Sequence, residues 1–363
     1  MPTEAAHDQA GGGSAPADAA LLDAPLDERT RSRLVARLGL GVTLTFLIAM
    51  AFDWTLSYLA PSFAAMLLQA RSRPTLKMAA TVLLVSFMLM LGCYLLAGFA
   101  RIYPPLFQLA LIPLLFWTFR YSLRGGTSLF ALLILLGLML LPMAAKVSPQ
   151  LSWESAASFV WNIALALAVA AFMYMLLPPL RSEPAPVPKP ALPEAEAIRR
   201  AWIMALITGS FTIVYYSFDW TNVHTPLYIA IYIMQLSLAS TLTATKGILG
   251  ANIVAGIIAM LLYTLIVMVP NFVFMAVLVL LVMLQLSRLI FSDKPWAPLA
   301  GLALSSTMIL LGSAMGSYTD DGGDMFLDRM GELGAAALYA VAALYVFEAL
   351  WPSTLRQQRV DSL

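Results

Sequence analysis

Two aspartates lie in a four-residue sequence that this chain contains twice. The sequence Phe-Asp-Trp-Thr at residues 52–55 returns at residues 218–221, 166 positions further along (219 − 53). Both copies adjoin long apolar stretches, where a carboxylate is costly and often functional. Asp53 and Asp219 could therefore take up protons on one side of a membrane and release them on the other. The structural alternative is that each aspartate caps the helix that follows it.

Four other kinds of residue recur in pairs at matching places in the chain. The pairs are Gln69 and Gln235, Pro61 and Pro226, Trp54 and Trp220, and Lys77 and Lys246. Inside a membrane, a glutamine can bind substrate or bond a neighbouring helix. A proline can bend a helix beside a substrate site. The lysines would attract anions or extend to lipid headgroups, and tryptophan is common at the membrane interface. We therefore treat all eight residues as candidates for a substrate path.

Signatures of enzymes and of metal or nucleotide sites are missing from the sequence. There is no Gly-x-x-x-x-Gly-Lys-Ser/Thr loop, no His-Glu-x-x-His and no Gly-x-Ser-x-Gly. Cys93 is the single cysteine, so no intramolecular disulfide can form. We expect no enzyme activity, catalytic residue, metal or cofactor. Isolated amides in apolar stretches are weaker candidates for substrate binding, namely Gln108, Gln285, Asn162, Asn252 and Asn271.

These candidates are positioned by a chain that is mostly apolar. Hydrophobic residues make up 61% of it and charged residues 11%, whereas a soluble protein carries about 25% charged residues. The net charge of +1 gives no reason to expect a nucleic acid partner. Segments of about 20 apolar residues cross a bilayer as helices, and we expect twelve. They cover 35–52, 56–70, 76–98, 104–119, 126–146, 154–177, 199–217, 223–240, 245–268, 270–287, 296–315 and 328–351.

The basic residues indicate how these spans are oriented. With a cytoplasmic N-terminus, only Arg101, Lys146 and Arg329 of the 21 basic residues fall outside, which leaves 18 inside. Cytoplasmic loops of membrane proteins carry such an excess of lysine and arginine. We therefore expect a multi-pass membrane protein with both termini in the cytoplasm and the lipid bilayer around it.

The recurring residues divide the chain into two similar halves. Residues 31–180 and 198–353 each hold six expected spans, and a linker at 181–197 with five prolines joins them. Residues 1–30 are expected to be a disordered cytoplasmic tail and 354–363 a second tail. Because six is even, both halves enter the membrane from the same side, so the repeat is parallel. The expected fold class is an all-α polytopic membrane protein with a 6+6 repeat and a pseudo-twofold axis along the membrane normal.

Two features together resemble a known transporter family. They are the Phe-Asp-Trp sequence near the end of the first span and the charged step Gln-Ala-Arg-Ser-Arg-Pro at residues 69–74, after the second. In a chain of two six-span halves, they resemble the fusaric acid resistance (FUSC) superfamily. Specifically, they resemble a compact bacterial branch of unknown function that is related to the aromatic acid exporter AaeB. The resemblance covers about residues 30–355.

The resemblance implies a function and a partner. The function would be secondary, proton-coupled efflux of aromatic carboxylates or other small amphipathic organic anions across the bacterial inner membrane. The implied partner is a periplasmic HlyD-type membrane-fusion adaptor, and a homo-oligomer is compatible with the family. Two alternatives stay open. A passive anion channel would conduct without Asp53 or Asp219, and a non-transporting membrane anchor for the adaptor would tolerate polar changes inside the bundle.

Overall fold

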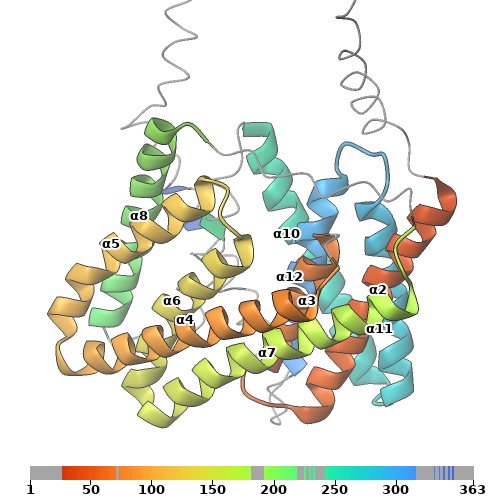
Figure 1. The fold of residues 1–363 in the computed structure, drawn as a ribbon, viewed down its shortest axis with the longest axis horizontal. Helices are drawn as coiled ribbons and strands as arrows, with labels where there is room; N and C mark the ends of the chain where they lie inside the picture. The colour runs from red at the N-terminus through yellow and green to blue at the C-terminus, as the bar shows by residue number, and fades with distance from the viewer. Residues whose placement is uncertain are drawn as a thin grey trace, which may run out of the picture.

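The computed structural model describes residues 27–70, 73–180, 192–218 and 242–315, with scattered positions between 225 and 346. In these residues the regular elements are all helices (Figure 1). The first half contains α2 (Glu28–Phe52), the 3₁₀ turn η1 (Ser57–Leu59), α3 (Ala60–Gln69), α4 (Leu76–Ile102), α5 (Pro104–Leu123), α6 (Ser128–Val147) and α7 (Pro149–Leu176). The second half contains α8 (Glu194–Ser217), α10 (Leu242–Met268), α11 (Phe272–Ile290) and α12 (Ala297–Met315).

Nine of the described helices are long and apolar enough to cross a membrane, and α3 is the exception. Their bounds follow the expected spans closely; the spans expected at 76–98 and 126–146 are α4 and α6, for example. The described part of the chain is therefore an all-helical, multi-pass membrane protein. The spans expected at 223–240 and 328–351 lie largely outside the described residues.

Exposed apolar side chains agree with a membrane environment. Leu95 and Ile102 of α4 are 63% and 69% exposed, and Ile253 and Leu261 of α10 are 63% and 59% exposed. A water-soluble protein rarely exposes such continuous apolar faces. These helix surfaces are suited to contact with lipid tails.

Side chains at the helix starts explain several of the boundaries. The Thr75 hydroxyl accepts a hydrogen bond from the Met78 amide at the start of α4, and Ser148 accepts one from Leu151 at the start of α7. Asn271 accepts bonds from the amides of Val273 and Phe274 at the start of α11. Such caps satisfy the free N–H groups of a first helical turn.

Helices of the two halves pack against one another. In Figure 1, α5 and α8 lie together on one side of the molecule, and α2 and α11 lie together on the other. Thus the fourth helix of the first half packs on α8, and α11 packs on α2. The short helix α3 lies against α12 and α7, so it also touches the second half. We call the end of the bundle with Glu28 and Glu194 the proximal end and the end with Phe52 and Ser217 the distal end.

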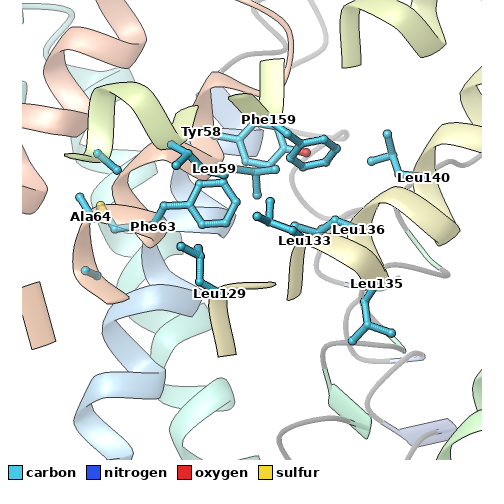
Figure 2. Close-up of a cluster of buried hydrophobic side chains, with 14 of the residues drawn as sticks. Tyr58, Leu59, Phe63, Ala64, Leu129, Leu133, Leu135, Leu136, Leu140 and Phe159 are labelled. Atoms are coloured by element: carbon cyan, nitrogen blue, oxygen red, sulfur yellow. The ribbon is translucent and has the colours of Figure 1, made fainter. Parts of the chain in front are cut away.

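A continuous apolar core joins α3 to the rest of the first half. Figure 2 shows Tyr58 of η1 and Phe63 of α3 beside Phe159 of α7 and Leu133 of α6. All four side chains are at most 8% exposed. The short helix is therefore held by packing on both sides, with its own half on one and α12 on the other.

Candidate functional site

The first copy of the Phe-Asp-Trp-Thr sequence, residues 52–55, forms the distal turn between α2 and η1. Asp53 ends α2 with φ 41°, and Leu56 begins the next turn with φ 59°. In the described residues these are the non-glycine positions with positive φ, a conformation that is uncommon for L-residues. The Asp53 side chain is exposed, and η1 begins without a side-chain cap. The aspartate therefore terminates α2 and does not cap the following helix.

A buried asparagine holds this turn. Asn162 of α7 is fully buried, and its side-chain oxygen accepts a hydrogen bond from the Trp54 indole N–H at 2.9 Å. Its side-chain amide donates to the Leu56 carbonyl, also at 2.9 Å. One amide thus satisfies two polar groups of the turn that would otherwise be buried without partners. From the sequence, Asn162 was predicted only as an isolated amide, with no link to Trp54.

The second helix of the first half differs from the expected span. We expected a membrane-crossing helix at 56–70 that Pro61 bends. The structure instead has one 3₁₀ turn and then a ten-residue α3, in whose first turn Pro61 lies. Proline suits that position because the first turn has no internal acceptor for the missing N–H. Pro61 therefore begins α3, and the interruption of the helix lies before it.

One face of α3 runs along α12. The Ser62 hydroxyl donates to the Ser305 carbonyl at 3.3 Å, and the Gln69 side chain lies against Gly301, where a Cβ atom would come within 2.7 Å of the Gln69 oxygen. At the other end of this contact, a Cβ on Gly312 would lie 2.4 Å from that of Tyr58. The candidate Gln69 is thus placed in a close helix contact between the two halves.

The remaining candidates are spread over the molecule. Lys77 lies in the first turn of α4, and Lys246 lies near the start of α10; both are exposed. They therefore lie on the proximal side of the bundle, apart from the turn at Asp53. Four candidates, Trp220, Asp219, Pro226 and Gln235, lie outside the described residues.

Ion pairs join the two halves at the proximal end. Arg31 of α2 pairs with Asp293, which follows α11. Glu194 at the start of α8 accepts a hydrogen bond from Arg120 Nε at 3.0 Å and pairs with Arg124 at 2.8 Å. Both contacts between the halves, α2 with α11 and α5 with α8, therefore carry a proximal ion pair.

The distal end is joined differently. Gln108 of α5 donates to the Ser217 hydroxyl at 2.9 Å. The Lys146 ammonium at the end of α6 donates to the Tyr216 carbonyl and lies 3.9 Å from the centre of the Tyr216 ring. The Tyr216 hydroxyl donates to the Ala100 carbonyl of α4 at 3.1 Å. Sequence analysis recognised Lys146 only as one of the few outer basic residues.

Residues 35–173 match a family model described as "Protein of unknown function (DUF2955)". The matched segment begins in α2 and ends in α7, so it coincides with the first group of helices. No curated protein and no solved structure matches the chain.

Proposed function

We propose that this protein is a secondary transporter of the bacterial inner membrane that exports small organic anions carrying an aromatic ring. It would be a compact relative of the FUSC superfamily, built as a parallel 6+6 repeat with cytoplasmic termini. In this orientation the proximal end faces the cytoplasm. An HlyD-type adaptor would continue the export path on the distal side.

The observation that carries this proposal is the reciprocal packing of the two halves. Among the described helices, α2 packs on α11 and α8 packs on α5, which pairs the first expected span of each half with the fourth expected span of the other. A pseudo-twofold axis between the halves requires such a pair of equivalent contacts. The family match supports the same division, since it covers the six helices of the first half without entering the second. In transporters built from parallel repeats, the substrate path lies between the repeats.

The short helix α3 supports a path in this region. Interrupted helices line substrate sites in many transporters because their free backbone groups can bind ligands. The polar groups of Ser62 and Gln69 face α12, which belongs to the other half. A substrate path beside this contact would therefore border polar side chains and not an entirely apolar wall.

Transport in inverted membranes tests the proposal. We would measure the accumulation of labelled 4-hydroxybenzoate in inside-out vesicles with an imposed pH gradient, for the wild type and for Asp53→Asn/Asp219→Asn. Coupled export predicts accumulation that requires the gradient in the wild type. Loss in the double variant would assign coupling to the aspartates. Accumulation that persists in the double variant would still support export but would show that the aspartates do not couple it to protons.

A passive anion channel is the second candidate, and one observation favours it. Asp53 is exposed at a helix end and is not enclosed by the bundle, whereas coupling carboxylates inside membranes usually face a protein interior or cavity. A channel predicts anion flux that follows the membrane potential and stops at electrochemical equilibrium. Accumulation against the anion gradient would exclude it, and vesicles that neither accumulate nor conduct the anion would contradict both functions.

A further inference from the structure

We infer that the proximal end of α11 binds an anionic phospholipid, with Arg288 and Lys294 at the phosphate of its headgroup and an acyl chain along the helix. The inference goes beyond the proposed function, because it concerns the lipid around the protein and not a transported substrate. Arg288 lies in the last turn of α11, and Lys294 lies in the turn between α11 and α12. Neither residue was a candidate from the sequence.

The side chains of Arg288 and Lys294 are both exposed. Asp293, the acidic residue beside them in the sequence, pairs with Arg31 of α2. Within the described residues, the Arg288 side chain forms no ion pair or hydrogen bond. Its guanidinium presents N–H donors in a planar fork that fits phosphate oxygens, and the Lys294 ammonium adds a second positive charge. Together the two side chains are suited to bind an anionic phosphate.

The arginine that corresponds to Arg288 in the first half has a different environment. Arg120 lies 168 positions before Arg288 (288 − 120), near the end of α5, and its Nε donates to Glu194 at 3.0 Å. The counterpart of Glu194 is Glu28 at the start of α2, 166 positions earlier (194 − 28). Although α2 packs on α11, the described residues contain no pair between Glu28 and Arg288. Arg120 therefore joins two helices, whereas Arg288 stays available to a ligand at the surface.

An exposed apolar stripe leads from Arg288 along α11. Val273, Val277 and Leu281 recur at every fourth position and are 68%, 50% and 55% exposed. Arg288 follows Leu281 by seven residues, so it lies on the same helix face. Along the helix axis, Leu281 is about 10 Å and Val277 about 16 Å from Arg288, and one leaflet of hydrocarbon is about 15 Å deep. An acyl chain of a lipid held at Arg288 would therefore run along this stripe.

Trp296 indicates the depth at which the headgroups lie. It is 40% exposed, and tryptophan is enriched where headgroups meet hydrocarbon. The Ser292 amide bonds the Leu289 carbonyl at 3.2 Å, so the chain turns directly after α11, and the Lys294 ammonium lies 5.0 Å from the centre of the Trp296 ring. The 19 residues of α11 span about 28 Å, close to the hydrocarbon thickness of about 30 Å. The last turn of α11, with Arg288, therefore lies at the level of the headgroups.

Quenching of Trp296 by brominated lipids tests the site in the full-length protein. The protein would be placed in phosphatidylcholine nanodiscs that contain a small fraction of brominated phosphatidylglycerol or, for comparison, of brominated phosphatidylcholine. The quenching that disappears in Trp296→Phe reports the lipid beside Trp296. The site predicts that phosphatidylglycerol is enriched there over phosphatidylcholine. Arg288→Gln should lower this enrichment about fivefold, as expected for one basic residue beside an anionic headgroup, and Arg288→Gln/Lys294→Gln should lower it further. Arg288→Lys should keep more of it than Arg288→Gln, because lysine keeps the charge.

Lys246→Gln is the matched control. Lys246 is an exposed cation on the same side of the bundle, but it belongs to α10, so its loss should leave the enrichment beside Trp296 unchanged. An equal loss in Lys246→Gln and Arg288→Gln would reveal only a general attraction of the surface for anionic lipid and would overturn the site. The site is also overturned if Arg288→Gln keeps the wild-type enrichment, including the case in which it only lowers Tm as a lost charge at a helix end would. Displacement of the lipid by dissolved glycerol phosphate would show a site for free phosphate and would contradict lipid binding. The transport assay is independent of these outcomes.

Discussion

The hydrogen bonds of Asn162 should set the stability of the turn between α2 and α3. Asn162→Ala removes the bonds to the Trp54 indole and the Leu56 carbonyl, both 2.9 Å long and fully or partly buried. Side-chain hydrogen bonds in membrane proteins contribute about 0.6 kcal/mol on average and up to about 1.7. Two of them give roughly 1–3 kcal/mol for Asn162→Ala. Trp54→Phe removes one bond and should cost about 1 kcal/mol.

A double-mutant cycle isolates the bond between Asn162 and Trp54. The free energy of unfolding would be measured in mixed micelles with increasing SDS, with helix content followed by circular dichroism. We expect a coupling energy of roughly 0.5–1.5 kcal/mol between the two substitutions. Gln108→Ala is the control, since its bond to Ser217 is solvent-exposed and should be worth less than about 0.5 kcal/mol. A coupling energy near zero, or an Asn162→Ala protein as stable as the wild type, would refute the assignment.

Three further predictions use other described contacts. Asp53→Asn should keep the free energy of unfolding within about 0.5 kcal/mol of the wild type, because asparagine tolerates positive φ, whereas Asp53→Val should lower it by about 1 kcal/mol or more. The same SDS unfolding measures both variants, and equal stabilities would contradict the role of φ. Gly301→Ala should lower Tm, because the new Cβ would lie 2.7 Å from the Gln69 oxygen. Gln69→Ala in the same chain should restore part of this loss, and Tm changes that simply add in the double variant would argue against the contact. Arg31→Glu should lower the free energy of unfolding by less than about 1 kcal/mol, as expected for a partly exposed pair. Adding Asp293→Arg to the same chain should recover this loss, and a double variant that recovers nothing would show that the two residues do not interact.

The helices were predictable from the sequence because membrane spans depend on local composition. An apolar stretch of sufficient length must satisfy its backbone hydrogen bonds internally, so the expected span at 104–119 is α5, with its start at Pro104 and four added residues at its end. The interruption before α3 was not predictable in the same way. It depends on Asn162, more than 100 residues away, which stabilises two left-handed residues, Asp53 and Leu56, that local propensity disfavours.

The residues that the candidates contact could not be predicted from the sequence either. An isolated amide such as Gln69 can face lipid, a partner helix or a ligand, and only the packing of α3 on α12 places it against Gly301. The proximal ion pairs also depend on how the helices pack and could not be predicted from the sequence. Arg120 and Glu194 are 74 residues apart, and they meet because α5 ends where α8 begins.

The structure also gives contacts to several residues that recur in both halves. Trp54 bonds Asn162, Pro61 begins α3, and Gln69 packs on Gly301, whereas Asp53, Lys77 and Lys246 are exposed. Duplication preserves structural and functional residues alike, so the presence of a counterpart in the other half does not by itself separate a packing role from a substrate role. The contact of Lys146 with α8 lacks such a counterpart, because the second half has no basic residue between Lys294 and Arg329 and residue 50, 166 positions before Tyr216, is methionine. Lys146 instead bonds one of the last carbonyls of α8, where a cation stabilises the end of a helix, so this contact has a structural cause of its own that does not depend on the repeat.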